Sequence, residues 1–68
     1  MTSEDYLMAQ ALVLAIEVLS NQPGALRPDN NIREMKEGLD RLAVPPNLMA
    51  HLQSRAREQI DRLTANRS

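Results

Sequence analysis

Side chains that could do acid–base or nucleophilic chemistry are few in this chain of 68 residues. The single histidine, His51, is predicted to lie at the edge of the last helical segment beside Arg55 and Glu58, away from the apolar positions. None of the four serines has a histidine and an acid at a spacing that suggests a catalytic triad. One histidine without any cysteine also gives too few ligands for a conventional zinc site. We therefore expect no catalytic residue, no cofactor and no bound metal, and we interpret the protein as a non-enzyme.

Three carboxylates, Glu34, Glu37 and Asp40, share part of a predicted helix and are the next candidates for a metal or acid–base site. Each has a basic neighbour at helical spacing, in Arg33, Lys36 or Arg41. Mixed charges at such spacing are typical of a solvent-exposed helix face. We favour that interpretation over a catalytic one.

Arginines form a weak basic stripe on the last helical segment: Arg55, Arg57, Arg62 and Arg67. The first three are the possible nucleic-acid contacts, and they make a dimeric DNA-binding regulator an alternative function. Glu58 and Asp61 interrupt the stripe, the formal net charge is -1, and Tyr6 is the only aromatic residue. Because nucleic-acid binders use a concentrated basic surface and stack bases on aromatic rings, we disfavour a nucleic-acid partner.

Two proline-containing breaks, at about residues 21–30 and 44–47, divide the chain into three segments of helical periodicity. We predict an all-α protein, a small three-helix bundle or helical hairpin assembly, as a single domain over residues 1–68. Its helices should cover about residues 3–20, 30–43 and 47–65. The first helix is expected to be central and to take part in an oligomer.

Local signals refine these elements. Thr2 or Ser3 is the expected N-cap of the first helix, and Asn31 with Glu34 has the spacing of a capping box for the second. Residues 22–25, with the sequence Gln-Pro-Gly-Ala, fit a type II turn. Gly38, inside the second helix, reflects either close approach of another helix or simple tolerance.

The first helix is apolar over a much wider arc than the others. At about 100° per residue, its apolar side chains cover about 220°, against roughly 100° to 120° in the other two helices. The strip that this leaves for water consists of Tyr6, Gln10, Val13, Glu17 and Ser20. Two helices of the same chain do not easily cover so wide an apolar surface.

The apolar arc divides into two seams. One consists of Leu7, Ala11, Leu14 and Val18. The other consists of Met8, Leu12, Ala15, Ile16 and Leu19, and it is the predicted protein interface. One seam can receive the second and third helices, whereas full burial of the four large residues of the other would contribute about 6–12 kcal/mol before entropic corrections. The competing interpretation is a monomer that buries the first helix completely.

Size favours association. A domain of this length buries only about 60% of its unfolded surface, and oligomerisation is the remaining supplement when disulfides and metals are excluded. We therefore predict a protein–protein interaction module, an adaptor, regulator or assembly subunit that forms a homo-oligomer, with a dimer favoured. A larger protein partner is also possible, and an inhibitor or antitoxin-like protein that uses its apolar helix is a further alternative.

Charge and composition complete the sequence-based interpretation. Residues 1–26 carry a net charge of -3 and residues 27–68 one of +2, which favours an antiparallel or head-to-tail arrangement. The first apolar stretch is too short to span a bilayer and has an acidic start, so we expect a cytoplasmic protein without a membrane partner. Seven arginines against one lysine suggest a GC-rich bacterial or phage genome. No segment carries a motif specific enough to name a family.

Overall fold

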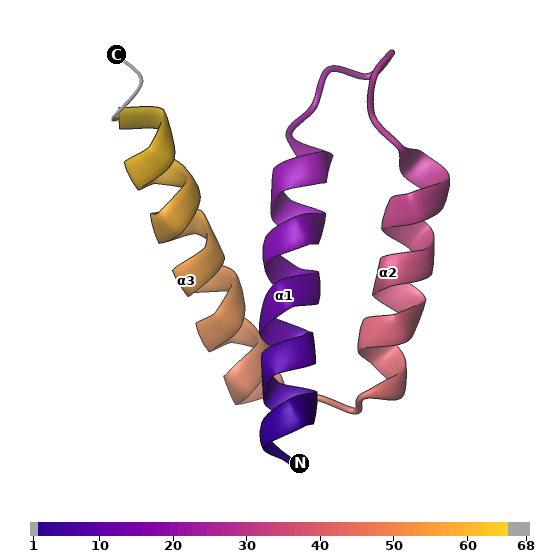
Figure 1. Ribbon diagram of the computed structural model, residues 1–68, viewed down its shortest axis with the longest axis vertical. Helices are drawn as coiled ribbons and strands as arrows, with labels where there is room; N and C mark the ends of the chain where they lie inside the picture. Colours follow the sequence, from indigo (N-terminus) through magenta and orange to yellow (C-terminus); the bar gives the residue numbers. More distant parts are fainter. Residues whose placement is uncertain (1, 66–68) are drawn as a thin grey trace.

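The computed structural model describes residues 2–65 and contains three helices, with no strand among these residues (Figure 1). They are α1 (Ser3–Ser20), α2 (Asp29–Arg41) and α3 (Pro46–Ala65). Helix α1 lies in the middle, with α2 on one side and α3 on the other (Figure 1). The predicted all-α class and the central place of the first helix are confirmed.

Helix α1 occupies the predicted range and begins at a side-chain cap. Thr2 is the N-cap residue, and its Oγ1 accepts a hydrogen bond of 3.1 Å from the backbone N–H of Asp5. Such a bond satisfies one of the donors that a helix start leaves unpaired. Glu4 and Asp5 lie in the first turn, where the positive end of the helix dipole stabilises negative charge.

Helix α2 does not begin with the predicted capping box of Asn31 and Glu34. It begins at Asp29, and the N-cap position belongs to Pro28, whose carbonyl accepts the N–H of Ile32 at 3.0 Å without a side-chain cap. Arg27 Nε donates to Asp29 Oδ1 at 2.7 Å. Proline has no N–H of its own to satisfy, so it stands at a helix start without cost. The helix ends at Arg41, two residues before the predicted limit.

The connection between α1 and α2 turns one residue later than predicted. The carbonyl of Pro23 accepts the N–H of Leu26 at 2.8 Å, so Gly24 and Ala25 are the central residues. Neither glycine of the protein has a positive φ. A type II turn over residues 22–25 needs a positive φ at its third residue, so that prediction is wrong.

The connection between α2 and α3 is short and carries the one positive φ of a non-glycine residue within residues 2–65. Ala43 has φ 52° and follows Leu42, the C-cap of α2. This is the position where helices most often end on a left-handed glycine. Pro46 then takes the first position of α3, and the carbonyl of Pro45 accepts the N–H of Met49 at 2.9 Å.

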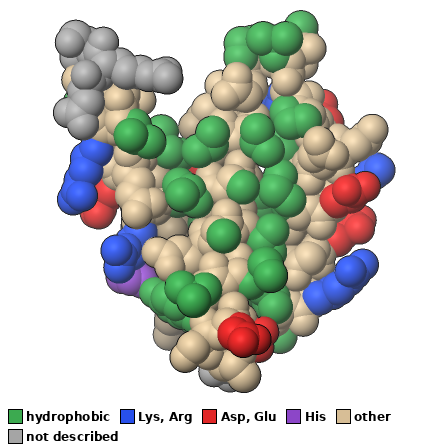
Figure 2. Space-filling view, viewed as in Figure 1, with side chains coloured by type: hydrophobic (Ala, Val, Ile, Leu, Met, Phe, Trp, Pro, Cys, Tyr) green, Lys and Arg blue, Asp and Glu red, His purple; other side chains and the backbone are tan. Residues whose placement is uncertain are grey.

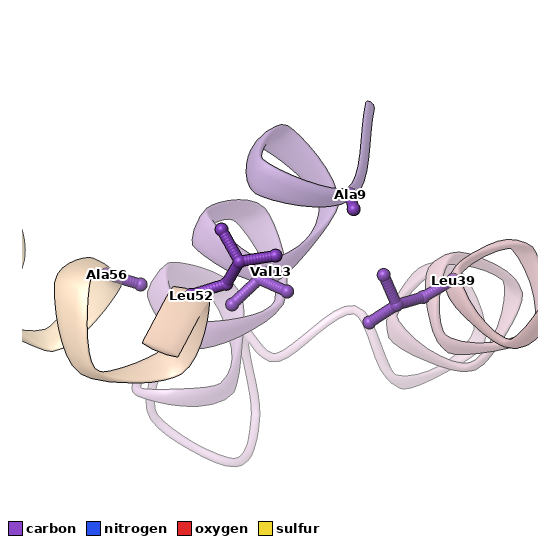
Figure 3. Packing of buried hydrophobic residues seen from close by; sticks show 5 residues of the cluster. All are labelled: Ala9, Val13, Leu39, Leu52 and Ala56. Carbon is purple, nitrogen blue, oxygen red and sulfur yellow. The ribbon is translucent and has the colours of Figure 1, made fainter. Parts of the chain in front are cut away.

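The core is formed by small and medium side chains on both sides of α1. Its cluster consists of Ala9, Val13, Leu39, Leu52 and Ala56 (Figure 3). Leu52 and Ala56 come from α3 and Leu39 from α2, while Ala9 and Val13 come from α1 (Figure 3). Within residues 2–65, α1 packs against both neighbours, whereas the backbones of α2 and α3 do not approach each other closely. Helix α1 therefore makes the close backbone approaches that hold the three helices together.

The inward face of α1 is not the predicted one. Val13, assigned to the strip facing water, is 3% exposed, and Tyr6, Gln10 and Glu17 of the same strip are half-buried. Only Ser20 is exposed as expected. An apolar arc of about 220° leaves the rotation of a helix about its own axis poorly determined. In the fold, the small residue Ala9 and the medium-sized Val13 point inward, where short side chains let the neighbouring helices approach closely.

Candidate interaction surface

The outward side of α1 exposes large apolar side chains. Leu7 is 63% exposed, Met8 55% and Val18 39%, and Ala11 between them is also exposed. We call these four residues the apolar face of α1. Figure 2 shows hydrophobic side chains along the middle of this side of the molecule, with the Lys and Arg side chains toward its outer edges. An apolar patch bordered by charged residues is a common feature of protein–protein interaction sites.

The position of the apolar face follows from how α1 is packed. At about 100° per residue, Leu7, Ala11 and Val18 lie within about 40° of one another and nearly opposite to Ala9 and Val13. Ala9 and Val13 belong to the cluster that includes residues of α2 and α3, and the opposite side of α1 is left uncovered within residues 2–65. The apolar face is therefore exposed because two neighbours do not surround a helix that is apolar nearly all round.

The predicted interface residues do not share one exposed surface in the structure. Met8 is exposed, and Ala15 and Leu19 are half-buried. Leu12 packs against α2, where its Cδ1 lies 4.0 Å from the Cβ position of Gly38, and Ile16 packs against the core cluster.

Conversely, three members of the seam expected to receive α2 and α3 are exposed. They are Leu7, Ala11 and Val18, while the fourth, Leu14, is half-buried against the core. The apolar face therefore takes residues from both predicted seams. The alternating spacing of four and three residues had already grouped Leu7, Ala11, Leu14 and Val18 into one predicted seam, but it did not show that this seam faces outward.

The molecule has more surface than a self-contained domain of its size. Its accessible area is 5198 Å², whereas a compact monomer of 7.6 kDa has about 4,300 Å². Its radius of gyration is 12.6 Å, against about 11 Å for a compact chain of this length. The fold therefore exposes roughly 900 Å² more surface than a compact monomer of this mass.

A hollow of about 280 Å³ is lined by residues of all three helices. Its apolar lining includes Val13, Ile16, Leu39 and Met49, and its polar lining includes Glu17, Lys36, Asp40 and Gln53. Val13 lies nearly opposite to the apolar face on α1. This hollow therefore differs from the apolar face in that charges of both signs line it.

The candidate nucleic-acid contacts do not form one stripe. Arg55 and Arg62 line a shallow hollow on the outside of α3, together with His51. Arg57 points to a different side, where its Nε lies 3.8 Å from Glu17 Oε2 of α1. Arg67 lies outside the described residues. The described arginines of α3 are thus divided between two sides of that helix, and one of them faces a carboxylate.

The candidate catalytic groups are likewise scattered. Glu34, Glu37 and Asp40 are exposed side chains of α2. Over residues 2–65, no three His, Asp or Glu side chains come together in a way that could hold a metal ion. None of the helices in this range is long and apolar enough to cross a membrane.

Comparison of the chain with protein-family models, with curated proteins and with solved structures found no match. The functional argument therefore rests on the surface of the molecule itself.

Proposed function

We propose that the protein is a small non-enzymatic interaction module that self-associates through the apolar face of α1, most simply as a homodimer, and acts as an adaptor, regulator or assembly subunit. One observation carries the proposal: the central helix, which holds the whole fold together, leaves Leu7, Met8 and Val18 exposed. Monomeric domains bury the large apolar residues of their central element, because this burial is their main source of stability.

The energy available at this surface supports association. Full burial of an exposed Leu, Met or Val side chain contributes about 1.5–3 kcal/mol. Scaled by the exposed fractions of Leu7, Met8 and Val18, this gives about 2–5 kcal/mol per protomer before the costs of association. A second copy offers the same surface, and self-complementary patches of this kind form the two-fold interfaces that are commonest among soluble oligomers.

A pair of matched variants tests the proposal. Leu7→Glu places a charge in the apolar face, whereas Leu26→Glu makes the same change at a leucine that is 73% exposed in the connection between α1 and α2. We expect sedimentation velocity to show dimers for the wild type and for Leu26→Glu, and monomers for Leu7→Glu at the same concentration. Circular dichroism should show that Leu7→Glu keeps its helices. Dimers that survive Leu7→Glu would overturn the proposal.

A further inference from the structure

We infer that two copies of this chain pair through α1 in antiparallel orientation, about a two-fold axis that passes between residues 12 and 13. This inference rests on the proposed self-association and adds the partner, the direction and the register of the contact. It follows from the order of residues along the exposed side of α1 and from the charges at the two ends of the helix.

The exposed side of α1 has the spacing of a coiled-coil seam. Its positions alternate by three and four residues: Glu4, Leu7, Ala11, Leu14, Val18 and Asn21. All six are exposed except Leu14, which is half-buried at the border of the apolar face. Residues repeating every 3.5 positions stay on the line of contact when two helices supercoil to the left. Two α1 helices can therefore remain in contact along their full length.

When the second copy runs in the opposite direction, each of these six side chains faces one that complements it in size or charge. In antiparallel register, Leu7 faces Val18 of the second copy, and Ala11 faces Leu14 of the second copy. The second pairing places a short side chain opposite a long one, which fills space at the density that protein interiors require. At the ends, Glu4 faces Asn21 of the second copy, whose neutral amide can donate a hydrogen bond to the carboxylate.

Parallel pairing lacks this complementarity. It would place Ala11 against its own copy and leave a gap there, since the flanking Leu7 and Leu14 pairs hold the helices apart. It would also bring the first turns of both helices together, where each carries the exposed Glu4 and the half-buried Asp5. Like charges at such proximity repel each other.

The shape of the molecule allows the contact. The three helices lie side by side with α1 in the middle (Figure 1), and the Cα extents of the molecule are 38 × 26 × 18 Å. The apolar face lies opposite to Ala9 and Val13 on α1, so neither neighbouring helix covers it. Two copies would stack broad side against broad side, with the two α1 helices in the middle of a two-layered assembly.

Disulfide trapping tests the orientation, because the chain has no cysteine of its own. Leu7→Cys and Val18→Cys each introduce a single thiol at an exposed position. In the antiparallel register, residue 7 of one copy lies near residue 18 of the other. Residue 7 of one copy and residue 7 of the other would be separated by eleven positions along the helix axis, or about 16 Å. This is too far for a disulfide, whose Cα atoms lie within about 7 Å of each other.

We expect the mixture of Leu7→Cys and Val18→Cys proteins, equilibrated in a glutathione buffer, to form the mixed disulfide, identified by its mass. Each variant alone should stay reduced. Leu26→Cys mixed with Leu7→Cys is the control for chance encounters and should remain unlinked.

The mass of each reduced sample is also measured by light scattering, which reports self-association independently of any disulfide. The two measurements together distinguish failure of this inference from failure of the proposed function. Dimers that link residue 7 to residue 7, or 18 to 18, would overturn the antiparallel orientation and leave self-association intact. Dimers that form neither the mixed disulfide between residues 7 and 18 nor a disulfide between identical residues would overturn the pairing of the two α1 helices. A monomeric mass for the wild type would overturn the proposed function and this inference together.

Discussion

The two sides of α1 have similar composition and opposite surroundings. The inward side carries Ala9 and Val13, which are 0% and 3% exposed, and the outward side carries Leu7, Met8 and Val18, of which Leu7 is 63% exposed. Leu7 and Met8 are thus exposed although they are larger than the buried Ala9 and Val13. A helix buries what its neighbours can reach at close distance, and hydrophobicity alone does not decide which side turns inward. The comparison between these two sides organises the predictions below.

The largest effect is expected on the inward side. Val13→Glu would replace a side chain that is 3% exposed with a charged one, beside Leu39 and Leu52 of the core cluster. Burial of a charge in apolar surroundings costs up to several kcal/mol, which is a large part of the stability of a small domain. We expect this variant to lose its cooperative thermal transition in circular dichroism. A folded Val13→Glu protein with wild-type stability would contradict the assignment of the inward side.

The same substitution on the outward side should act on association. In a dimer, folding is linked to protomer concentration, so the wild-type melting temperature should rise with concentration. We expect Leu7→Glu to remove this dependence while a cooperative melt remains, at a temperature near that of the dilute wild type. Calorimetry over a hundredfold range of concentration provides the measurement. An unchanged concentration dependence in Leu7→Glu would show that the outward side takes no part in association.

A substitution at the end of α2 should have an intermediate effect on the free energy of unfolding, without changing either side of α1. Ala43 has φ 52°, a left-handed conformation that costs a residue with a Cβ roughly 1 kcal/mol and costs glycine almost nothing. Ala43→Gly should therefore raise the free energy of unfolding by up to about 1 kcal/mol, as measured by urea denaturation. A loss of stability in this variant would mean that the unfolded-state entropy of glycine outweighs the relief of strain.

Gly38 of α2 tests the contact with Leu12, which lies between the inward and outward sides of α1. A Cβ added there would meet Leu12 Cδ1 at 4.0 Å, which is ordinary contact, so the structure shows no steric need for glycine. Gly38→Ala should raise stability by up to about 1 kcal/mol through helix propensity. Urea denaturation at fixed protein concentration measures it, with light scattering to check that association is unchanged. Destabilisation by this small change would show that α1 and α2 lie closer together than described.

The smallest effect is expected from the contact between α1 and α3 at the surface. Arg57 Nε lies 3.8 Å from Glu17 Oε2, and the arginine side chain is 75% exposed. Exposed pairs of this kind contribute at most about 1 kcal/mol, so Arg57→Ala should change the unfolding free energy by less than that. A double-mutant cycle with Glu17→Gln isolates the interaction. A coupling of several kcal/mol would mean that this contact is much more strongly desolvated.

The helices could be predicted from the sequence because their limits depend on local chemistry. The breaks at Pro23 and Pro45, together with the cap at Thr2, identify the ends of three helical segments without reference to any partner. Where the expectation for a terminus was wrong, as at Asn31, another possible helix start was present nearby. The carbonyl of Pro28 starts α2 there without a side-chain cap.

The rotation of α1 could not be predicted, because it depends on packing between segments that are distant in the sequence. Val13 lies between polar neighbours on the helical wheel, which suggested an exposed position. In the fold it packs in the same cluster as Leu52 and Leu39, contributed by different helices. Of the predicted interface, Met8 is exposed, whereas Leu12 and Ile16 belong to the packing within the chain. An excess of apolar surface was visible in the sequence, but its direction was not.

The solution mass of the wild-type protein tests the central claim most directly. Light scattering behind size exclusion, repeated over a wide range of concentration, reports whether the apolar face of α1 is covered by a second copy. We predict twice the 7.6 kDa of the chain at high concentration, falling toward the monomer on dilution. A mass of 7.6 kDa at every concentration would contradict the account, because the exposed Leu7, Met8 and Val18 would then have no second copy to cover them.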